Sequence, residues 1–258
     1  MSERPLFIAE APPPAGSPTP HETWDDGRMS LIEHLEDLRK VLIHSLVAWG
    51  VGSVLGLAAS FWIVKALTQP LVLAHFQPVV LSPVGTIGVY LKVGLLTGLV
   101  LALPVIGQRI WWFVAPGLKP VERRFARPLM LSSLVLFVVG ALLAYGFTYV
   151  GIQMLAHFNA LTGITYIAEL DNYLGTMAFL IVAFGITFEF PVALVMLALL
   201  GVLSSARLRS GRKYAILIIF TVGYLVTPGV DPITPLPLII PLLLLYEGSI
   251  LVIRRMGR

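Results

Sequence analysis

The sequence has 258 residues, of which 57% are hydrophobic and only 12% are charged. This composition excludes a soluble globular domain and predicts an all-α polytopic membrane protein, because long apolar segments cross a bilayer as helices. The chain has no cysteine, which excludes disulfides and thiol chemistry, and we attribute its net charge of +4 to membrane topology, with no nucleic-acid partner.

The first predicted element is a cytoplasmic tail at residues 1–28. It holds six prolines among small and acidic residues. A segment of this composition does not bury enough apolar surface to fold, so we expect it to be disordered. Residues 29–258 then form the membrane domain.

An amphipathic helix is predicted to open this domain. Its apolar stripe consists of Leu31, Leu35, Leu38 and Leu42, which recur at helical spacing. Charged residues occupy the other face, among them Glu36, Asp37, Arg39 and Lys40. We expect this helix to lie on the inner membrane surface and then turn into the first span. The charges alone also fit a solvated face with a Glu36–Lys40 ion pair.

Six apolar windows follow and predict six transmembrane helices. They are residues 41–64, 88–114, 128–150, 173–203, 214–226 and 236–253. After the first span, Pro70 is expected to start an outside loop. The fifth span is short, because its uncharged run of 17 residues reaches only about 25 Å against about 30 Å of hydrocarbon. Pro237 and Pro241 make the sixth span irregular.

The basic residues give the orientation of these spans. Fifteen of the 18 lysines and arginines lie in four segments that share one side of a six-span arrangement. Lysine and arginine are enriched in cytoplasmic loops, so this side is cytoplasmic. We therefore expect a membrane protein with both termini in the cytoplasm.

Glu189 is an acid in the middle of the predicted fourth span, with 17 uncharged residues on either side. Charged groups inside a membrane are costly and usually functional. Pro191 lacks the N–H that would bond the carbonyl of Thr187, so the turn around Glu189 should be interrupted. We expect Glu189 to be a docking point for a partner's membrane helix. The alternative is a protonated, structural Glu bonded to a neighbouring helix.

Two further acids lie in loops. Glu122 is the only acid of its loop, beside Arg123 and Arg124, and is either a ligand site or a local ion pair. Asp231 is expected to bond the backbone of the last outside turn or to cap the sixth span.

The sequence shows no phosphate loop, no paired His ligands and no Ser/His/Asp set, so we expect no enzyme, cofactor or metal site. Energy would come from the membrane potential or a proton gradient.

Five groups of short strings resemble the TatC family, the core subunit of the twin-arginine translocase. They are HLEDLR at 34–39, PVI at 104–106 with FVAP at 113–116, ERR at 122–124, FGITFEFP at 184–191, and TP at 227–228 with Asp231, Pro241, Tyr246 and Glu247. The resemblance covers roughly residues 30–253. It implies a concave, glove-like bundle with short fifth and sixth helices. It also implies export of folded proteins with TatA- and TatB-type partners, other copies of the chain, and the proton-motive force.

The resemblance also assigns roles to individual residues. It implies that Asp37 and Glu122 bind the two arginines of a signal peptide, although the family usually has Glu at position 37. Glu36 precedes Asp37 here, so either acid can be the ligand. Arg39, Phe113, Arg124 and Pro70 also match motif positions, and we expect them to shape the site.

Two matches concern other regions. Glu189 matches the family's intramembrane Glu, which faces the concave side. Asp231 follows two inserted residues, Gly229 and Val230, so its carried-over role is weaker.

A second class of function remains open, a proton-coupled secondary transporter of a small solute with Glu189 as the carrier. Such transporters usually contain inverted repeats, and we find none between the first three and the last three spans.

Overall fold

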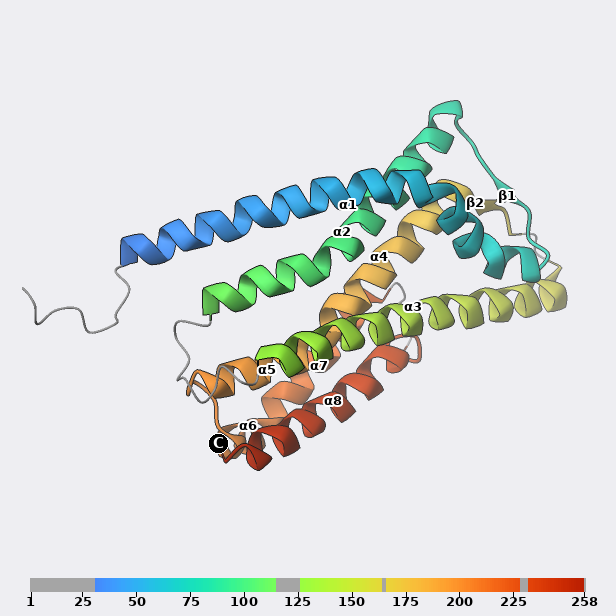
Figure 1. Ribbon diagram of the computed structural model, residues 1–258. Helices are drawn as coiled ribbons and strands as arrows, with labels where there is room; N and C mark the ends of the chain where they lie inside the picture. Colours follow the sequence, from blue (N-terminus) through green and yellow to red (C-terminus); the bar gives the residue numbers. More distant parts are fainter. Residues whose placement is uncertain (1–30, 115–125, 164–165, 228–231, 258) are drawn as a thin grey trace, which may run out of the picture.

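The structure, a computed structural model, describes residues 31–114, 126–163, 166–227 and 232–257, and helices carry most of these residues (Figure 1). The helices are α1 (Leu31–Leu73), α2 (Pro83–Val114), α3 (Ala126–Thr162), α4 (Leu170–Phe188), α5 (Phe190–Leu199), α6 (Ser205–Ser210), α7 (Arg212–Val226) and α8 (Leu236–Arg255). Two short strands, β1 (Pro78–Val79) and β2 (Ala168–Glu169), pair in parallel between the connections that precede α2 and α4. The predicted all-α membrane class is confirmed.

Five helical segments of the described chain are long and apolar enough to cross a membrane. They are His34–Leu73, Val84–Phe113, Pro128–Thr162, Leu170–Leu199 and Leu236–Arg255. The predicted fifth span corresponds to α7, whose 15 residues reach about 22 Å. A short fifth helix is therefore observed, and the order of elements is consistent with the six-span arrangement.

Helix α1 corrects two expectations. It runs for 43 residues without a break, so no separate surface helix turns into the first span. At about 1.5 Å per residue α1 is about 65 Å long, and its charged N-terminal turns can extend beyond the hydrocarbon while staying helical. Pro70 lies fully buried inside α1 and does not start the outside loop.

Two tyrosines explain how the helix continues through Pro70. Proline has no N–H and displaces the carbonyl four residues earlier, which here belongs to Ala66. The hydroxyl of Tyr145 on α3 donates to that carbonyl at 3.3 Å, and the hydroxyl of Tyr173 on α4 donates to the carbonyl of Leu67 at 3.0 Å. The Tyr145 hydroxyl thus replaces the backbone bond that Pro70 cannot make, and Tyr173 adds a second bond from a neighbouring helix one residue later.

Helices α1 and α2 pack backbone against backbone. A Cβ atom added to Gly52 would lie 2.5 Å from the carbonyl oxygen of Gly98, and one added to Gly56 would meet the carbonyl of Gly94. Small residues at four-residue spacing allow this close approach between membrane helices. The indole of Trp49 also donates across the interface to the carbonyl of Leu95 at 3.0 Å.

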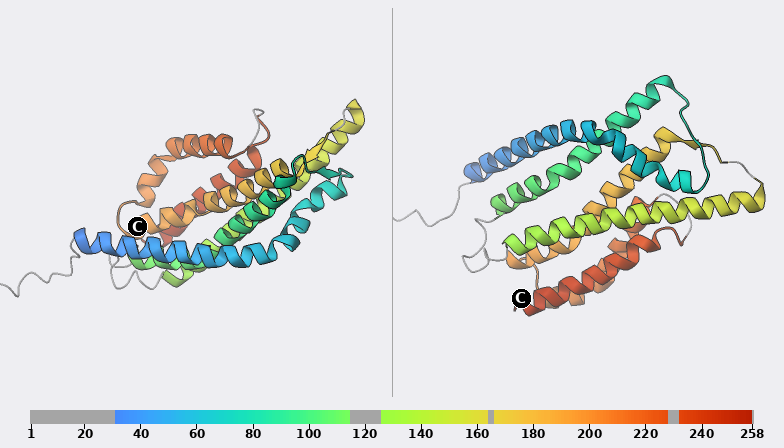
Figure 2. Two further views of the ribbon diagram at one scale, coloured as in Figure 1. Left: turned by 90° about the horizontal axis from the view of Figure 1, so that it is seen from above. Right: turned by 45° about the vertical axis from the view of Figure 1, so that its right-hand side comes forward.

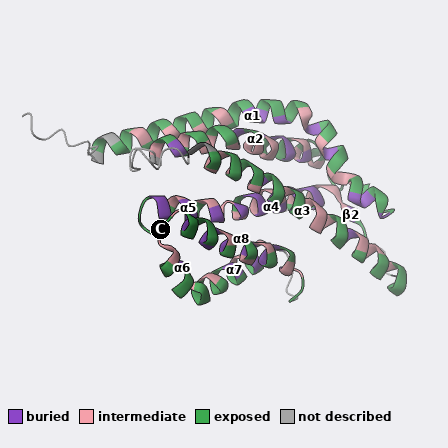
Figure 3. Ribbon diagram, turned by 60° about the horizontal axis from the view of Figure 1, so that its bottom comes forward, coloured by how far each residue is buried: buried purple, intermediate pink, exposed green. Residues whose placement is uncertain are grey.

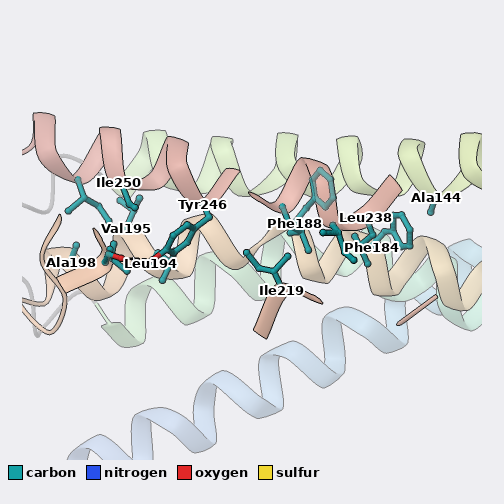
Figure 4. Packing of buried hydrophobic residues seen from close by; sticks show 14 of the residues in the cluster. Ala144, Phe184, Phe188, Leu194, Val195, Ala198, Ile219, Leu238, Tyr246 and Ile250 are labelled. Atoms are coloured by element: carbon teal, nitrogen blue, oxygen red, sulfur yellow. Dashed lines mark hydrogen bonds between the residues drawn. The ribbon is translucent and has the colours of Figure 1, made fainter. Parts of the chain in front are cut away.

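The C-terminal bundle, α3 to α8, has a core of large side chains. Figure 4 shows its buried cluster, in which Phe184 and Phe188 of α4 pack with Leu238 of α8, and Tyr246 lies beside Leu194. A second cluster joins α4 to the ends of α1 and α2 through residues such as Leu71, Val93 and Leu174.

Helix α4 lies between the two sides of the molecule. Seen from above, α1 and α2 lie on one side and α7 on the other (Figure 2). Figure 3 shows long exposed stretches on α1 and α7. Their exposed residues include large apolar ones such as Trp62 and Leu225. Exposed apolar side chains of this kind match a surface that faces lipid.

Candidate functional site

The acids predicted to bind arginine lie on the N-terminal part of α1. Nζ of Lys40 is 3.3 Å from Oδ1 of Asp37 and 3.6 Å from Oε1 of Glu36. This confirms the predicted Glu36–Lys40 pair and adds Asp37 to it. The Asp37 and Glu36 side chains are 37% and 62% exposed, so both carboxylates remain accessible. Exposed ion pairs are weak, and a planar guanidinium that bonds through two N–H groups is a stronger partner than Lys40.

Phe113 connects this acidic turn to the end of α2. The ring of His34 stacks on the ring of Phe113, with centroids 4.2 Å apart and an interplanar angle of 20°. His34 precedes Asp37 by three residues, which is about one helical turn. The stack therefore places the acids beside the point where the chain leaves α2 at Val114. Arg39 lies exposed on the same part of α1.

Three of the predicted site residues, Glu122, Arg124 and Asp231, lie outside the described residues, so their roles stay predictions. Glu122 follows the last residue of α2 by eight positions. The N-cap position of α8 is occupied by Pro235.

The helix is interrupted at Glu189, as predicted from Pro191. Helix α4 ends at Phe188 and α5 begins at Phe190. The N–H of Glu189 bonds the carbonyl of Ile186, three residues back, at 3.0 Å. Regular helical spacing resumes with the N–H of Ala193, which bonds the carbonyl of Glu189 at 3.0 Å.

The Glu189 side chain is half-buried, and Ser133 on α3 lies near its carboxyl group. Its two neighbours in the chain are aromatic: Phe188 is buried, and Phe190 stacks on Tyr246 with ring centroids 6.5 Å apart. The proximity of Ser133 fits the structural interpretation of Glu189. The partial exposure fits the docking interpretation, since a partner can still reach the carboxyl group.

Two interhelical ion pairs were not predicted. Nζ of Lys92 on α2 lies 2.8 Å from Oδ1 of Asp171 on α4. Nη2 of Arg212 on α7 lies 2.7 Å from Oε2 of Glu247 on α8. The available signal was that Lys92 and Glu247 interrupt apolar windows, where charged residues need partners. Among the described residues, no group of three His, Asp or Glu side chains can hold a metal.

Over most of its length the sequence is similar to proteins of one family. The family model described as "Sec-independent protein translocase protein (TatC)" matches residues 33–241. The TatC protein of Desulforapulum autotrophicum is 37% identical over 238 residues, covering 91% of this chain and 87% of that protein. The TatC protein of Aquifex aeolicus is 36% identical over 229 residues, covering 86% of this chain and 93% of that protein.

The fold is also similar to two crystal structures of the twin arginine translocase receptor TatC. The first has a TM-score of 0.71 and 34% identity, and covers 88% of this chain and 100% of that one. The second, in DDM, has a TM-score of 0.75 and 35% identity, and covers 86% of this chain and 99% of that one.

Proposed function

Because this chain belongs to the TatC family of Sec-independent protein translocase proteins, we propose that it is the subunit that recognises the twin-arginine signal peptides of folded cargo. In this proposal one arginine binds Asp37 or Glu36 on α1, and the other binds Glu122 in the loop after α2. The observation that carries the proposal is the stack of His34 on Phe113, which holds the acids of α1 beside the start of that loop.

The chemistry of the acids supports arginine as the ligand. A guanidinium is planar, always charged and bonds a carboxylate through two parallel N–H groups, whereas a lysine ammonium is a point charge. Two acids on separate elements would therefore discriminate an arginine pair from a lysine pair. When no peptide is bound, Lys40 forms ion pairs with Glu36 and Asp37. Arg39 and Arg124 shape the surroundings of the site.

The second part of the proposal concerns assembly. Membership of the family makes the chain a component of a translocase complex, and we assign its partners as TatA- and TatB-type single-span proteins and further copies of itself. Glu189 is the proposed polar docking point for a partner's membrane helix, within a concave face of a glove-like bundle. Its half-exposed carboxyl group between two aromatic residues supports this role. The proton-motive force is the proposed source of energy.

The proposed location is the bacterial inner membrane, with both termini in the cytoplasm. Reporter fusions at Ala160, near the end of α3, and at the C terminus measure this directly. Activity of a periplasmic reporter is expected at Ala160 alone, and activity at the C terminus would contradict the orientation.

The experiment that tests the function is complementation of a bacterial strain that lacks its own TatC. We expect the chain to restore export of a folded reporter with a twin-arginine signal, and Asp37→Ala and Glu122→Ala each to weaken photocrosslinking to the signal peptide. Because Glu36 can replace Asp37, the Glu36→Ala/Asp37→Ala double variant is included. Normal crosslinking in all of these variants would rule out the assigned site.

The alternative, a proton-coupled transporter of a small solute, is disfavoured by the family to which the chain belongs. Substrate-dependent proton uptake in vesicles that contain this chain alone would support the transporter function.

A further inference from the structure

A cavity of about 650 Å³ lies between α2, α4 and the end of α7. Its polar lining includes Lys92 of α2, Glu169 and Asp171 at the start of α4, and Thr227 after α7. By the order of the helices, this is the end of the bundle opposite the acidic turn of α1. The proposed export function does not use any of these side chains.

The cavity contains groups of both charges. Lys92 and Asp171 form an ion pair at 2.8 Å, yet their side chains are 44% and 43% exposed. An ammonium group has three N–H donors, so Lys92 can bond Asp171 and a further acceptor together. Gly175 keeps room beside it, because a Cβ atom at that position would lie 3.3 Å from Nζ of Lys92.

Glu169 adds a second acid. It occupies the N-cap position of α4, but its side chain makes no capping bond to the described residues of that helix. With one positive and two negative side chains, the cavity suits a ligand that carries an anionic group for Lys92 and a cationic donor for the acids.

The depth of the cavity indicates where such a ligand comes from. Lys92 precedes Arg109 by 17 residues on α2, which is about 26 Å and close to the hydrocarbon thickness of about 30 Å. The guanidinium of Arg109 lies 5.7 Å from the centre of the Trp112 ring, an aromatic and basic pair typical of a membrane interface. Lys92 therefore lies near the opposite interface, at the level of lipid headgroups.

Of two large apolar residues in the lining, Phe179 lies deeper than the charged groups and Leu225 lies near their level. Phe179 lies two turns into α4 beyond Asp171, and Leu225 lies in the last turn of α7. Their relative exposures of 54% and 81% are high for large apolar side chains. A charged head at the interface with apolar side chains beside and below it matches the shape of a phospholipid.

We propose that this cavity binds a phospholipid whose headgroup carries a primary ammonium, of the phosphatidylethanolamine type. The phosphate bonds Lys92, the ammonium bonds Glu169 and Asp171, and an acyl chain lies against Phe179 and Leu225. Phosphatidylcholine lacks the N–H donors that the acids require, and phosphatidylglycerol lacks the positive charge.

Native mass spectrometry of the full chain in detergent tests the proposal. The chain is incubated with equal amounts of phosphatidylethanolamine, phosphatidylcholine and phosphatidylglycerol with the same acyl chains. We expect bound phosphatidylethanolamine to exceed phosphatidylcholine about tenfold, the size of one charge-assisted hydrogen bond. Equal occupancy of these two lipids, or a preference for phosphatidylglycerol, would overturn the proposal.

Glu169→Gln is the main variant, since it keeps the Lys92–Asp171 pair and should reduce the preference for phosphatidylethanolamine over phosphatidylcholine. Glu10→Gln removes the same charge from the segment that precedes α1 and should leave the lipid preference unchanged. Gly175→Leu fills the space beside Lys92 without removing a charge and should lower occupancy by all three lipids. Unchanged preference in a folded Glu169→Gln protein would exclude the assigned headgroup contact.

Discussion

The α1–α2 hairpin and the C-terminal bundle of α3 to α8 differ in how often their glycines face backbone. In the hairpin, Cβ atoms on Gly52, Gly56 and Gly98 would all meet backbone of the facing helix. In the bundle, one on Gly140 would meet the carbonyl of Phe184, but one on Gly223 would lie 2.5 Å from Cγ1 of Ile239, a side-chain atom. A side chain can rotate away, but a helix backbone can move only as a whole.

This difference in packing suggests that the hairpin, which carries the proposed recognition site, is more rigid than the bundle, which carries the proposed docking point. The hairpin carries Asp37 and Phe113, and reading two arginines needs acids in a fixed geometry. The bundle carries Glu189 at an interrupted helix among large side chains, which can adjust to a docked helix. The proposed recognition site is thus on the more rigid part, and the proposed docking point is on the more adaptable part.

The largest effect is expected for Gly98→Ala in the hairpin. Forcing a methyl group against the backbone of Ser53 should lower the free energy of unfolding by about 1 to 3 kcal/mol. Gly107→Ala on the same helix is the matched control, because a Cβ atom there meets nothing within 4 Å. It should gain about 0.5 to 1 kcal/mol from helix propensity. Melting temperatures in detergent should therefore shift in opposite directions, and shifts of the same sign would contradict backbone packing.

A smaller loss is expected for Gly223→Ala in the bundle, because Ile239 can change rotamer. The prediction is sharpened by a double-mutant cycle with Ile239→Ala, which removes the side-chain atoms that the new methyl group would meet. In that background Gly223→Ala should be neutral or stabilising. A loss as large as that of Gly98→Ala, or one that persists in the Ile239→Ala background, would erase the difference between the two halves.

Tyr145 and Tyr173 join the two halves at the proline of α1. Removing either hydroxyl should lower the free energy of unfolding by about 1 kcal/mol, the usual size of one hydrogen bond. Tyr149→Phe, on the same helix as Tyr145, is the control and should leave the melting temperature unchanged. Pro70→Ala restores a backbone donor for the carbonyl of Ala66, so Tyr145→Phe should cost less in that background. Equal costs in both backgrounds would show that Pro70 does not explain the bond.

The smallest effect on stability is expected for Glu189→Ala. Hydrogen bonds inside a membrane contribute about 0.6 to 2 kcal/mol, enough to bias assembly without holding the fold. Docking predicts an unchanged melting temperature, reduced partner crosslinking and reduced export, with more function retained in Glu189→Gln. Ser133→Ala separates the alternatives, because a structural Glu189–Ser133 bond would make both alanine variants equally unstable. That outcome, with normal partner crosslinking, would establish the structural role.

Local chemistry made part of this fold predictable from sequence. The interruption at Glu189 follows from Pro191, and the short α7 follows from counting apolar residues. The course of α1 was not predictable in this way, because the carbonyl that Pro70 leaves without a donor is bonded by Tyr145, 79 residues away from Ala66. The partner of Lys92 is equally distant in sequence, at position 171.

The candidate site also combines features that the local sequence predicts with contacts that depend on distant residues. Its acids and Phe113 stand in motifs, but the contact between His34 and Phe113 arises only when α1 and α2 pack together. The sequence does contain a pattern that indicates this packing. Gly52 and Gly56 have the four-residue spacing of small residues that is typical of closely packed helix pairs.

The central claim is that acids on α1 and in the segment after α2 recognise an arginine pair. It is tested most directly by the affinity of the purified chain for one signal peptide with either two arginines or two lysines. The unmodified chain should bind the arginine peptide at least tenfold more tightly, as expected for the loss of bidentate hydrogen bonds. In a variant with Glu36→Gln, Asp37→Asn and Glu122→Gln, both peptides should bind weakly and equally. An undiminished preference for arginine in that variant would contradict the account.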